Sequence, residues 1–240
     1  MSKNRIYVMG VRRSGIHLLA NWLADQFGAA RVENNVDLSG LKQGKYLKLK
    51  DADTQIIILE DYPVETIEHL KVDKRLAEKV LGHCDNQHIV VLLRDPFNMA
   101  ASRIKHYDLL SAKRRWVDKK MALGQWSQYA EIVQDAPRSV VPVLYNEFVF
   151  SVEYRKGLCK QLHGVFLDSA MARVDENGLG SSFDGQSFGG HAQDMLVDER
   201  WKNYADVDAY WAMFTPEIKD VASTIFGTAV ENIKKEGLPC

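Results

Sequence analysis

Four short apolar runs recur along the chain, separated by longer segments in which apolar residues follow helical spacing. The runs predict strands at Ile6–Met9, Gln55–Leu59, His88–Leu93 and Ser139–Leu144. The other segments predict helices at Gly15–Phe27, Val64–Leu81, Pro96–Leu110, Ala112–Gln134, Tyr154–Leu162, Trp201–Tyr210 and Pro216–Phe226. Strands that are continuously apolar are typical of a parallel sheet covered on both faces. The alternation therefore predicts an α/β fold with three layers, in which a mostly parallel sheet carries helices on both faces.

Two further segments lie outside this alternation. Tyr46–Lys50 alternates polar and apolar residues, a pattern that suits an edge strand. Asn177–Gly190 is rich in glycine and serine, which disfavours the interior of a helix or strand. It predicts a surface loop, and loops of this length in a compact domain often act as lids or binding loops. No linker or internal repeat divides the sequence, so we expect a single domain over residues 1–240 that ends in helices.

The composition narrows the classes of partner. The 240 residues include 31 Lys and Arg against 32 Asp and Glu, a formal net charge of −1. Nucleic-acid-binding domains usually carry a strong basic excess, so we expect no nucleic-acid partner. No secretory signal or long apolar run is present, so we expect a cytoplasmic protein without an integral membrane segment. Cys84, Cys159 and Cys240 lack metal-ligand spacing, so no metal site is predicted.

The first predicted strand leads into a loop with the glycine spacing of a phosphate-binding P-loop. Gly10 and Gly15 enclose four residues, and a predicted helix follows. Backbone N–H groups and the positive end of the helix dipole then converge on one spot, which favours an anion. A nucleoside triphosphatase would continue with Lys and Ser or Thr, but Ile16 and His17 stand there instead. The loop therefore predicts a P-loop nucleotide-binding fold with a phosphate-like ligand and without the usual magnesium ligand.

A second group of polar residues follows the third predicted strand. Arg94 ends that strand, where open α/β sheets bind their ligands. Asp95 suits the N-cap of the next helix, and Pro96 suits its first position. Ser102 follows Arg94 by eight residues, two turns into the helix. One interpretation is that Arg94 and Ser102 both reach one group of a ligand. The other is that Arg94 is a structural ion-pair partner and Ser102 is a serine on the helix surface.

Together these motifs resemble the sulfotransferase superfamily, whose members use 3′-phosphoadenosine 5′-phosphosulfate (PAPS). Arg12–His17 lies over the family's Pro-Lys-Ser-Gly-Thr-Thr loop, and Arg94 with Ser102 matches its arginine–serine motif. Leu144–Phe148 is similar to a later Tyr-Glu-Asp-Leu motif, and the glycine-rich segment also has a counterpart. The resemblance extends from about residue 5 to about residue 227.

The resemblance implies that PAPS is the sulfuryl donor, that adenosine 3′,5′-bisphosphate is the product, and that no metal is required. It implies a donor site made of Arg12, Arg13, Ser14, Gly15, Ile16, His17, Arg94, Ser102, Tyr145, Ser181 and Ser182. Arg94 and Ser102 match the residues that bind the 3′-phosphate of PAPS in the family. Tyr145 either touches the adenine, as in several relatives, or is a buried residue at a strand end. A basic triplet of the family's lid is missing, and Arg173 or Arg200 could replace its charge.

The same resemblance implies a set of catalytic residues: Asp61, Glu60, Arg13 and His17. Arg13 matches the loop lysine that steadies the leaving oxygen, and it would act by its charge. Asp61 lies over the family's catalytic histidine, with Glu60 beside it. Either carboxylate would serve best as a base with its pKa raised toward neutrality by burial; otherwise both are an acidic helix start. His17 either contacts the phosphosulfate, acts as a base or has a structural partner.

The resemblance thus implies transfer of a sulfuryl group to a hydroxyl or amine of a small-molecule or glycan acceptor. Two alternatives stay open, a P-loop small-molecule kinase with a degenerate loop and a nucleotide-binding relative without catalysis. The identity of the acceptor and the oligomeric state are not indicated by the sequence.

Overall fold

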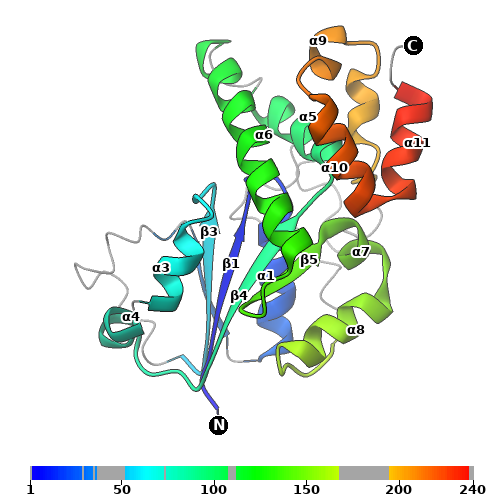
Figure 1. Cartoon of the computed structure of the whole chain (residues 1–240). Coiled ribbons are helices and arrows are strands. Elements are labelled where there is room, and N and C mark those ends of the chain that lie inside the picture. Colours follow the sequence, from blue (N-terminus) through cyan, green and yellow to red (C-terminus); the bar gives the residue numbers. More distant parts are fainter. Residues whose placement is uncertain are drawn as a thin grey trace.

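A parallel sheet forms the centre of the fold (Figure 1). The computed structural model describes residues 2–28, 30–34, 36, 52–72, 74–107, 112–167 and 195–237. Its strands are β1 (Asn4–Gly10), β2 (Ala30–Glu33), β3 (Thr54–Glu60), β4 (Asn86–Leu93) and β5 (Val140–Leu144). They lie in the order β2-β3-β1-β4-β5, and every pairing is parallel. The carboxyl ends of the strands therefore meet at one edge of the sheet.

Alternate residues of each central strand enter two separate cores. In β1, Tyr7 and Met9 pack on one face of the sheet, while Ile6 and Val8 pack on the other. The same division holds in β3 and β4, because successive side chains of a strand point to opposite faces. Burial on both faces explains why these strands are apolar without interruption.

Helices cover both faces. One core is completed by α1 (Ile16–Gln26), α7 (Tyr145–Phe150) and α8 (Val152–Gln161). The other is completed by α3 (Thr66–Val72), α4 (Lys74–Leu81), α5 (Pro96–Tyr107), α6 (Ala112–Asp135), η4 (Arg200–Tyr204), α9 (Asp208–Trp211), α10 (Pro216–Phe226) and α11 (Thr228–Gly237). Figure 1 shows α6 in front of the strands and α1 behind them. The predicted α/β fold with a parallel sheet between two helical layers is confirmed.

Several elements differ from the sequence prediction. β2 is a short edge strand that was not predicted, and α7 and α11 are additional helices. The segment predicted as one helix over Trp201–Tyr210 is a 3₁₀ helix, η4, followed by the short helix α9. Tyr46–Lys50 and Asn177–Gly190 lie outside the described residues.

Candidate functional site

The loop between β1 and α1 opens at the carboxyl edge of the sheet, as the glycine spacing predicts. A Cβ at Gly10 would lie 2.7 Å from the Leu92 carbonyl oxygen, so β1 can approach β4 closely only with glycine there. Gly15 has φ 94° and is the N-cap of α1, where it offers no side chain to cap the first turn. The Ser14 N–H donates a hydrogen bond to the Val11 carbonyl, with an N–O distance of 3.1 Å. The start of α1 is therefore a tight turn with the positive end of a helix dipole behind it.

Tyr145 closes one side of this turn. A Cβ at Gly15 would lie only 2.1 Å from Cε2 of Tyr145, so the ring packs directly against the glycine. The guanidinium carbon of Arg94 lies 4.7 Å from the centre of the same ring. Tyr145 is 4% exposed, so it is a buried support of the turn in this structure.

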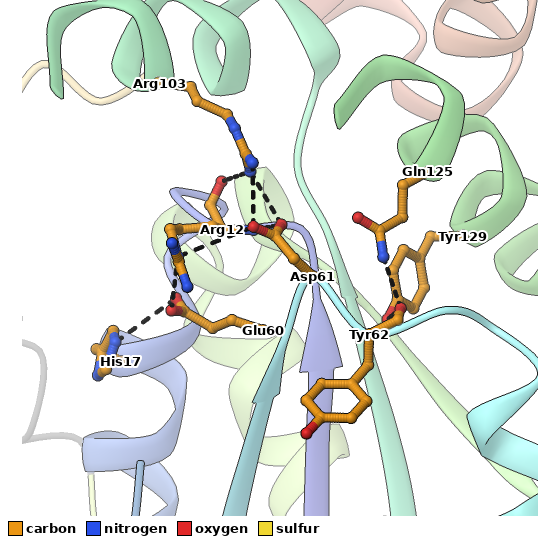
Figure 2. Close-up of polar contacts among 8 residues, drawn as sticks. All are labelled: Arg12, His17, Glu60, Asp61, Tyr62, Arg103, Gln125 and Tyr129. Atoms are coloured by element: carbon orange, nitrogen blue, oxygen red, sulfur yellow. Dashed lines mark hydrogen bonds and ion pairs between the residues drawn. The ribbon is translucent and has the colours of Figure 1, made fainter. Parts of the chain in front are cut away.

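Asp61, directly after β3, is the centre of a polar network at the turn (Figure 2). Its Oδ1 accepts hydrogen bonds from the Arg12 backbone N–H at 2.8 Å and from Nη1 of Arg103 at 2.9 Å. Its Oδ2 accepts a hydrogen bond from Nη2 of Arg103 at 3.0 Å. The Arg103 side chain is 5% exposed, so this forked ion pair is largely shielded from water.

Glu60 makes a second and looser set of contacts. Its Oε2 accepts a hydrogen bond from Nε of Arg12 at 3.2 Å, and its Oε1 lies 3.5 Å from Nε2 of His17. His17 is the second residue of α1, so the last residue of β3 and the first turn of α1 face each other. The Glu60 side chain is 6% exposed, while that of Arg12 is 38% exposed and extends toward solvent.

Positively charged neighbours lower the pKa values of Glu60 and Asp61, whereas a general base would benefit from a raised pKa. Burial raises the pKa of Glu60, but the hydrogen bond and charge of His17, with Arg12, outweigh it and hold the pKa below its usual value. Burial likewise raises the pKa of Asp61, but Arg103 and Arg12 outweigh it and lower the pKa. Neither carboxylate therefore has the raised pKa that would suit a general base best.

Arg94 lies buried between the loop and a distant segment of the chain. Its Nη1 donates to the Arg13 carbonyl at 3.3 Å, and its Nη2 donates to the Val197 carbonyl. Nε of Arg94 is buried and has no hydrogen-bond partner among the described residues. Arg94 thus joins the two sides of the site and keeps one donor for a further group.

Ser102 meets an arginine from the C-terminal part of the chain. Nη1 of Arg200, on η4, donates to Ser102 Oγ at 3.0 Å, and both residues are buried. Asn98 docks this segment on α5, because its Nδ2 donates to the Asp198 carbonyl and its Oδ1 accepts from the Trp201 N–H. Of the two arginines considered as substitutes for the lid triplet, Arg200 lies at Ser102, and Arg173 lies outside the described residues.

The remaining predicted site residues divide into three groups. Ser14 and Ile16 are buried, and the Ile16 side chain packs in the core, so only its backbone can face a ligand. Arg13 follows Arg12 with φ 74°, a conformation rare for a residue with a side chain. Ser181 and Ser182 lie outside the described residues.

Sequence reasoning missed the residues that hold the network from the helices. Arg103 is one of them: it lies next to Ser102 on α5, but its side chain reaches Asp61, while Ser102 accepts a hydrogen bond from Arg200. Nε2 of Gln125 and the Tyr129 hydroxyl, both on α6, donate to the Tyr62 carbonyl at 2.7 Å each (Figure 2). The spacing of four residues between Gln125 and Tyr129 indicates that they share one face of a helix. No pattern in the sequence indicates that both bind the Tyr62 carbonyl.

The described residues contain neither a metal-binding cluster nor a membrane-spanning helix. Within the described ranges, no cluster of three or more His, Cys, Asp or Glu side chains is arranged to hold a metal ion. No described helix combines the length and apolar character needed to cross a membrane.

The architecture is similar to that of solved sulfotransferase structures. The sulfotransferase domain of the olefin synthase from Synechococcus PCC 7002 aligns over 94% of this chain and 95% of that chain, with a TM-score of 0.56 and 14% identity. Mouse sulfotransferase SULT7A1 complexed with PAP aligns over 97% of this chain and 88% of that chain, with a TM-score of 0.46 and 16% identity. The sulfotransferase domain from the curacin biosynthetic pathway aligns over 93% and 98%, with a TM-score of 0.46 and 13% identity. No protein-family model and no curated protein matches the chain. The parallel sheet between two helical layers gives this chain the P-loop α/β fold of a sulfotransferase domain.

Proposed function

We propose that this protein transfers a sulfuryl group from PAPS to a hydroxyl or amine of a small-molecule or glycan acceptor. One observation carries the proposal: Arg94 connects the loop before α1, through the Arg13 carbonyl, to the segment that begins at Val197 and brings the buried Arg200 to Ser102. The uncapped start of α1 and the pair of Ser102 and Arg200 are the two polar sites that this link joins. The first is suited to one anionic group and the second to another. A nucleotide with phosphates at both its 5′ and 3′ positions has that distribution of charge.

The 5′-phosphosulfate would be held by the turn after β1. Its residues are Arg12, Arg13, Ser14, Gly15, Ile16 and His17. The backbone N–H groups of Gly15, Ile16 and His17 would face the phosphate, whereas that of Ser14 donates to the Val11 carbonyl. Arg13 supplies a fixed positive charge beside the leaving oxygen, because a guanidinium keeps its proton. The protein would then act by positioning and by charge, with little covalent chemistry of its own.

The 3′-phosphate would be held by Arg94, Ser102 and Arg200. Arg94 fits this role because its buried Nε has no partner among the described residues, and an anion would satisfy that donor. Ser102 offers a hydroxyl, and Arg200 brings a second guanidinium to it. By the family resemblance, Tyr145 would contact the adenine, and Ser181 and Ser182 would bind the nucleotide.

Glu60 is the less tightly held of the two carboxylates, and we assign it the acceptor proton on that ground. Its two contacts, at 3.2 Å and 3.5 Å, are longer than the three that hold Asp61 at 2.8–3.0 Å. A group held loosely by His17 and Arg12 can turn toward an acceptor hydroxyl more easily than one held by a bidentate ion pair. Glu60 therefore replaces Asp61 as the proposed base, with His17 beside it.

The test is a comparison of two nucleotides by isothermal titration calorimetry. We expect adenosine 3′,5′-bisphosphate to bind more tightly than adenosine 5′-monophosphate. Loss of a hydrogen bond to a charged group costs about 1.5–3 kcal/mol, so Ser102→Ala and Arg200→Gln should each weaken the bisphosphate about tenfold or more and leave the monophosphate unchanged.

Lys202→Gln is the matched control, because Lys202 lies on η4 but pairs with Glu199 at the surface. It should bind both nucleotides as the wild type does. Equal affinity of the wild type for the two nucleotides, or an equal loss of both in the variants, would contradict the 3′-phosphate site.

A further inference from the structure

We propose that Arg103 is a positioning residue that sets the donor loop through Asp61. The inference rests on the proposed function, because it assigns to that loop the binding of the PAPS phosphosulfate. It also gives Asp61 a role other than the base predicted from the sequence.

Arg103 and Asp61 together hold both backbone polar groups of Arg12. The Arg12 N–H donates to Oδ1 of Asp61 at 2.8 Å, and the Arg12 carbonyl accepts a hydrogen bond from Nη1 of Arg103 at 3.4 Å. Arg13 comes next, with φ 74°. A residue persists in this sparsely populated region only where its surroundings fix it. The ion pair supplies that constraint immediately before the strained residue (Figure 2).

Asp61 is itself anchored on both sides along the chain. Its N–H donates to the Gly10 carbonyl at 3.0 Å, and its own φ is 58°. The next carbonyl, that of Tyr62, accepts hydrogen bonds from Gln125 and Tyr129 of α6. Helix α5 thus holds the Asp61 carboxylate, α6 holds the backbone that follows Asp61, and the carboxylate holds the loop.

This geometry leaves Asp61 poorly suited to take a proton. Oδ1 already accepts two hydrogen bonds and Oδ2 accepts one, and the two from Arg103 form a planar fork. Protonation of either oxygen would break part of that arrangement. Asp61 therefore acts through Arg12 and Arg103, and its loss should raise the KM for the donor more than it lowers kcat.

The first test needs no ligand. We would measure hydrogen exchange of the Arg12 amide by NMR in the wild type, Asp61→Asn, Arg103→Gln and the double variant. The amide should exchange about tenfold faster in each single variant, and the double variant should exchange no faster than the singles, because one interaction is lost in all three. Lys156→Gln, which removes an exposed ion pair with Glu153 on α8, is the control and should exchange as the wild type does.

The second test is the affinity for adenosine 3′,5′-bisphosphate in the same set of variants. We expect each single variant to bind about tenfold more weakly and the double variant also about tenfold, where independent losses would multiply to about a hundredfold. A base role for Asp61 predicts instead an unchanged affinity and a loss of kcat alone in Asp61→Asn, with Arg103→Gln unaffected.

These outcomes separate the inference from the proposed function. If the wild type does not bind the bisphosphate, the proposed function fails, and the exchange of the Arg12 amide still decides whether Arg103 sets the loop. Wild-type exchange in Arg103→Gln would overturn the inference. If the charge variants do not fold, Arg103→Lys keeps the positive charge but cannot form the two-pronged contact with both Asp61 oxygens. It should still speed exchange of the Arg12 amide, and an unchanged rate would count against the inference.

Discussion

At the scale of single residues, the contact between Gly15 and Tyr145 sets the shape of the candidate donor loop. In Gly15→Ala the alanine backbone would have to keep the left-handed conformation, with φ 94°. Its Cβ would also overlap the Tyr145 ring, because it would lie 2.1 Å from Cε2. A left-handed conformation costs about 1–2 kcal/mol, and overpacking costs about 1–3 kcal/mol more. We therefore expect the free energy of unfolding in urea to fall by about 2–5 kcal/mol.

Gly28→Ala is the matched comparison for this prediction. Gly28 also has a positive φ, 69°, but a Cβ there would meet no atom within 4 Å among the described residues. Its substitution should cost only the conformational part, about 1–2 kcal/mol. Equal losses in the two variants would mean that Tyr145 yields without cost, and that the turn is not shaped by it.

The residues of the site differ in how far the sequence could predict them. Arg12–His17 follows a strand and opens a helix, so local spacing was enough to place it at the carboxyl edge of the sheet. Whether Asp61 is free or paired depends on Arg103, which lies 42 residues away on a different element. The contact of Arg200 with Ser102 spans 98 residues. Such pairs depend on how the chain packs, which no local pattern contains.

At the scale of secondary-structure elements, α6 is a long helix with a glycine in its interior. Gly124 lies within Ala112–Asp135, and a Cβ there would meet nothing within 4 Å among the described residues. Alanine lowers the conformational entropy of the unfolded chain and favours the helix, so Gly124→Ala should raise the free energy of unfolding by about 0.5–1 kcal/mol.

Gly157 of α8 offers an independent repeat of the same prediction, because a Cβ there is equally unobstructed. Both variants would be followed by urea unfolding monitored by circular dichroism. A loss of stability in Gly124→Ala but not in Gly157→Ala would show that α6 needs the glycine for a reason other than the helix itself.

The predicted elements were confirmed where burial was strong and missed where it was weak. β1, β3 and β4 are continuously apolar because both of their faces are covered. β2 is an edge strand whose residues are only partly buried or exposed, so it leaves no apolar run to detect. α7 follows β5 without a break, and the apolar residues at that junction suit either a strand or a helix.

At the scale of the whole molecule, the partly buried His88 predicts how stability depends on pH. His88 on β4 lies beside His163, with ring centres 5.9 Å apart. Burial and the neighbouring histidine lower the pKa of His88. The unfolded chain therefore binds a proton at higher pH than the folded chain does. The neutral form of His88 makes its full contribution to stability above the pKa of the unfolded chain, about 6.5. That contribution is lost as the pH falls from this value through the lower pKa of the folded chain.

Thermal unfolding of the wild type and His88→Gln between pH 8 and pH 5 tests this effect. Relative to its value at pH 8, the melting temperature of the wild type should fall further on acidification than that of His88→Gln. Parallel curves for the two proteins would show that His88 does not contribute to the pH dependence.

We expect the proposed donor site to bind a 3′-phosphorylated nucleotide without a metal. Thermal unfolding with adenosine 3′,5′-bisphosphate or Mg-ATP, each with and without EDTA, tests it most directly. A ligand at about 100 times its Kd stabilises by about 2.7 kcal/mol, which raises the melting temperature of a chain of this size by about 5–10 °C. We predict that the bisphosphate gives this shift with and without EDTA, and that Arg94→Ala abolishes it. Stabilisation by Mg-ATP alone, lost in EDTA, would contradict the proposed sulfotransferase and favour the kinase alternative.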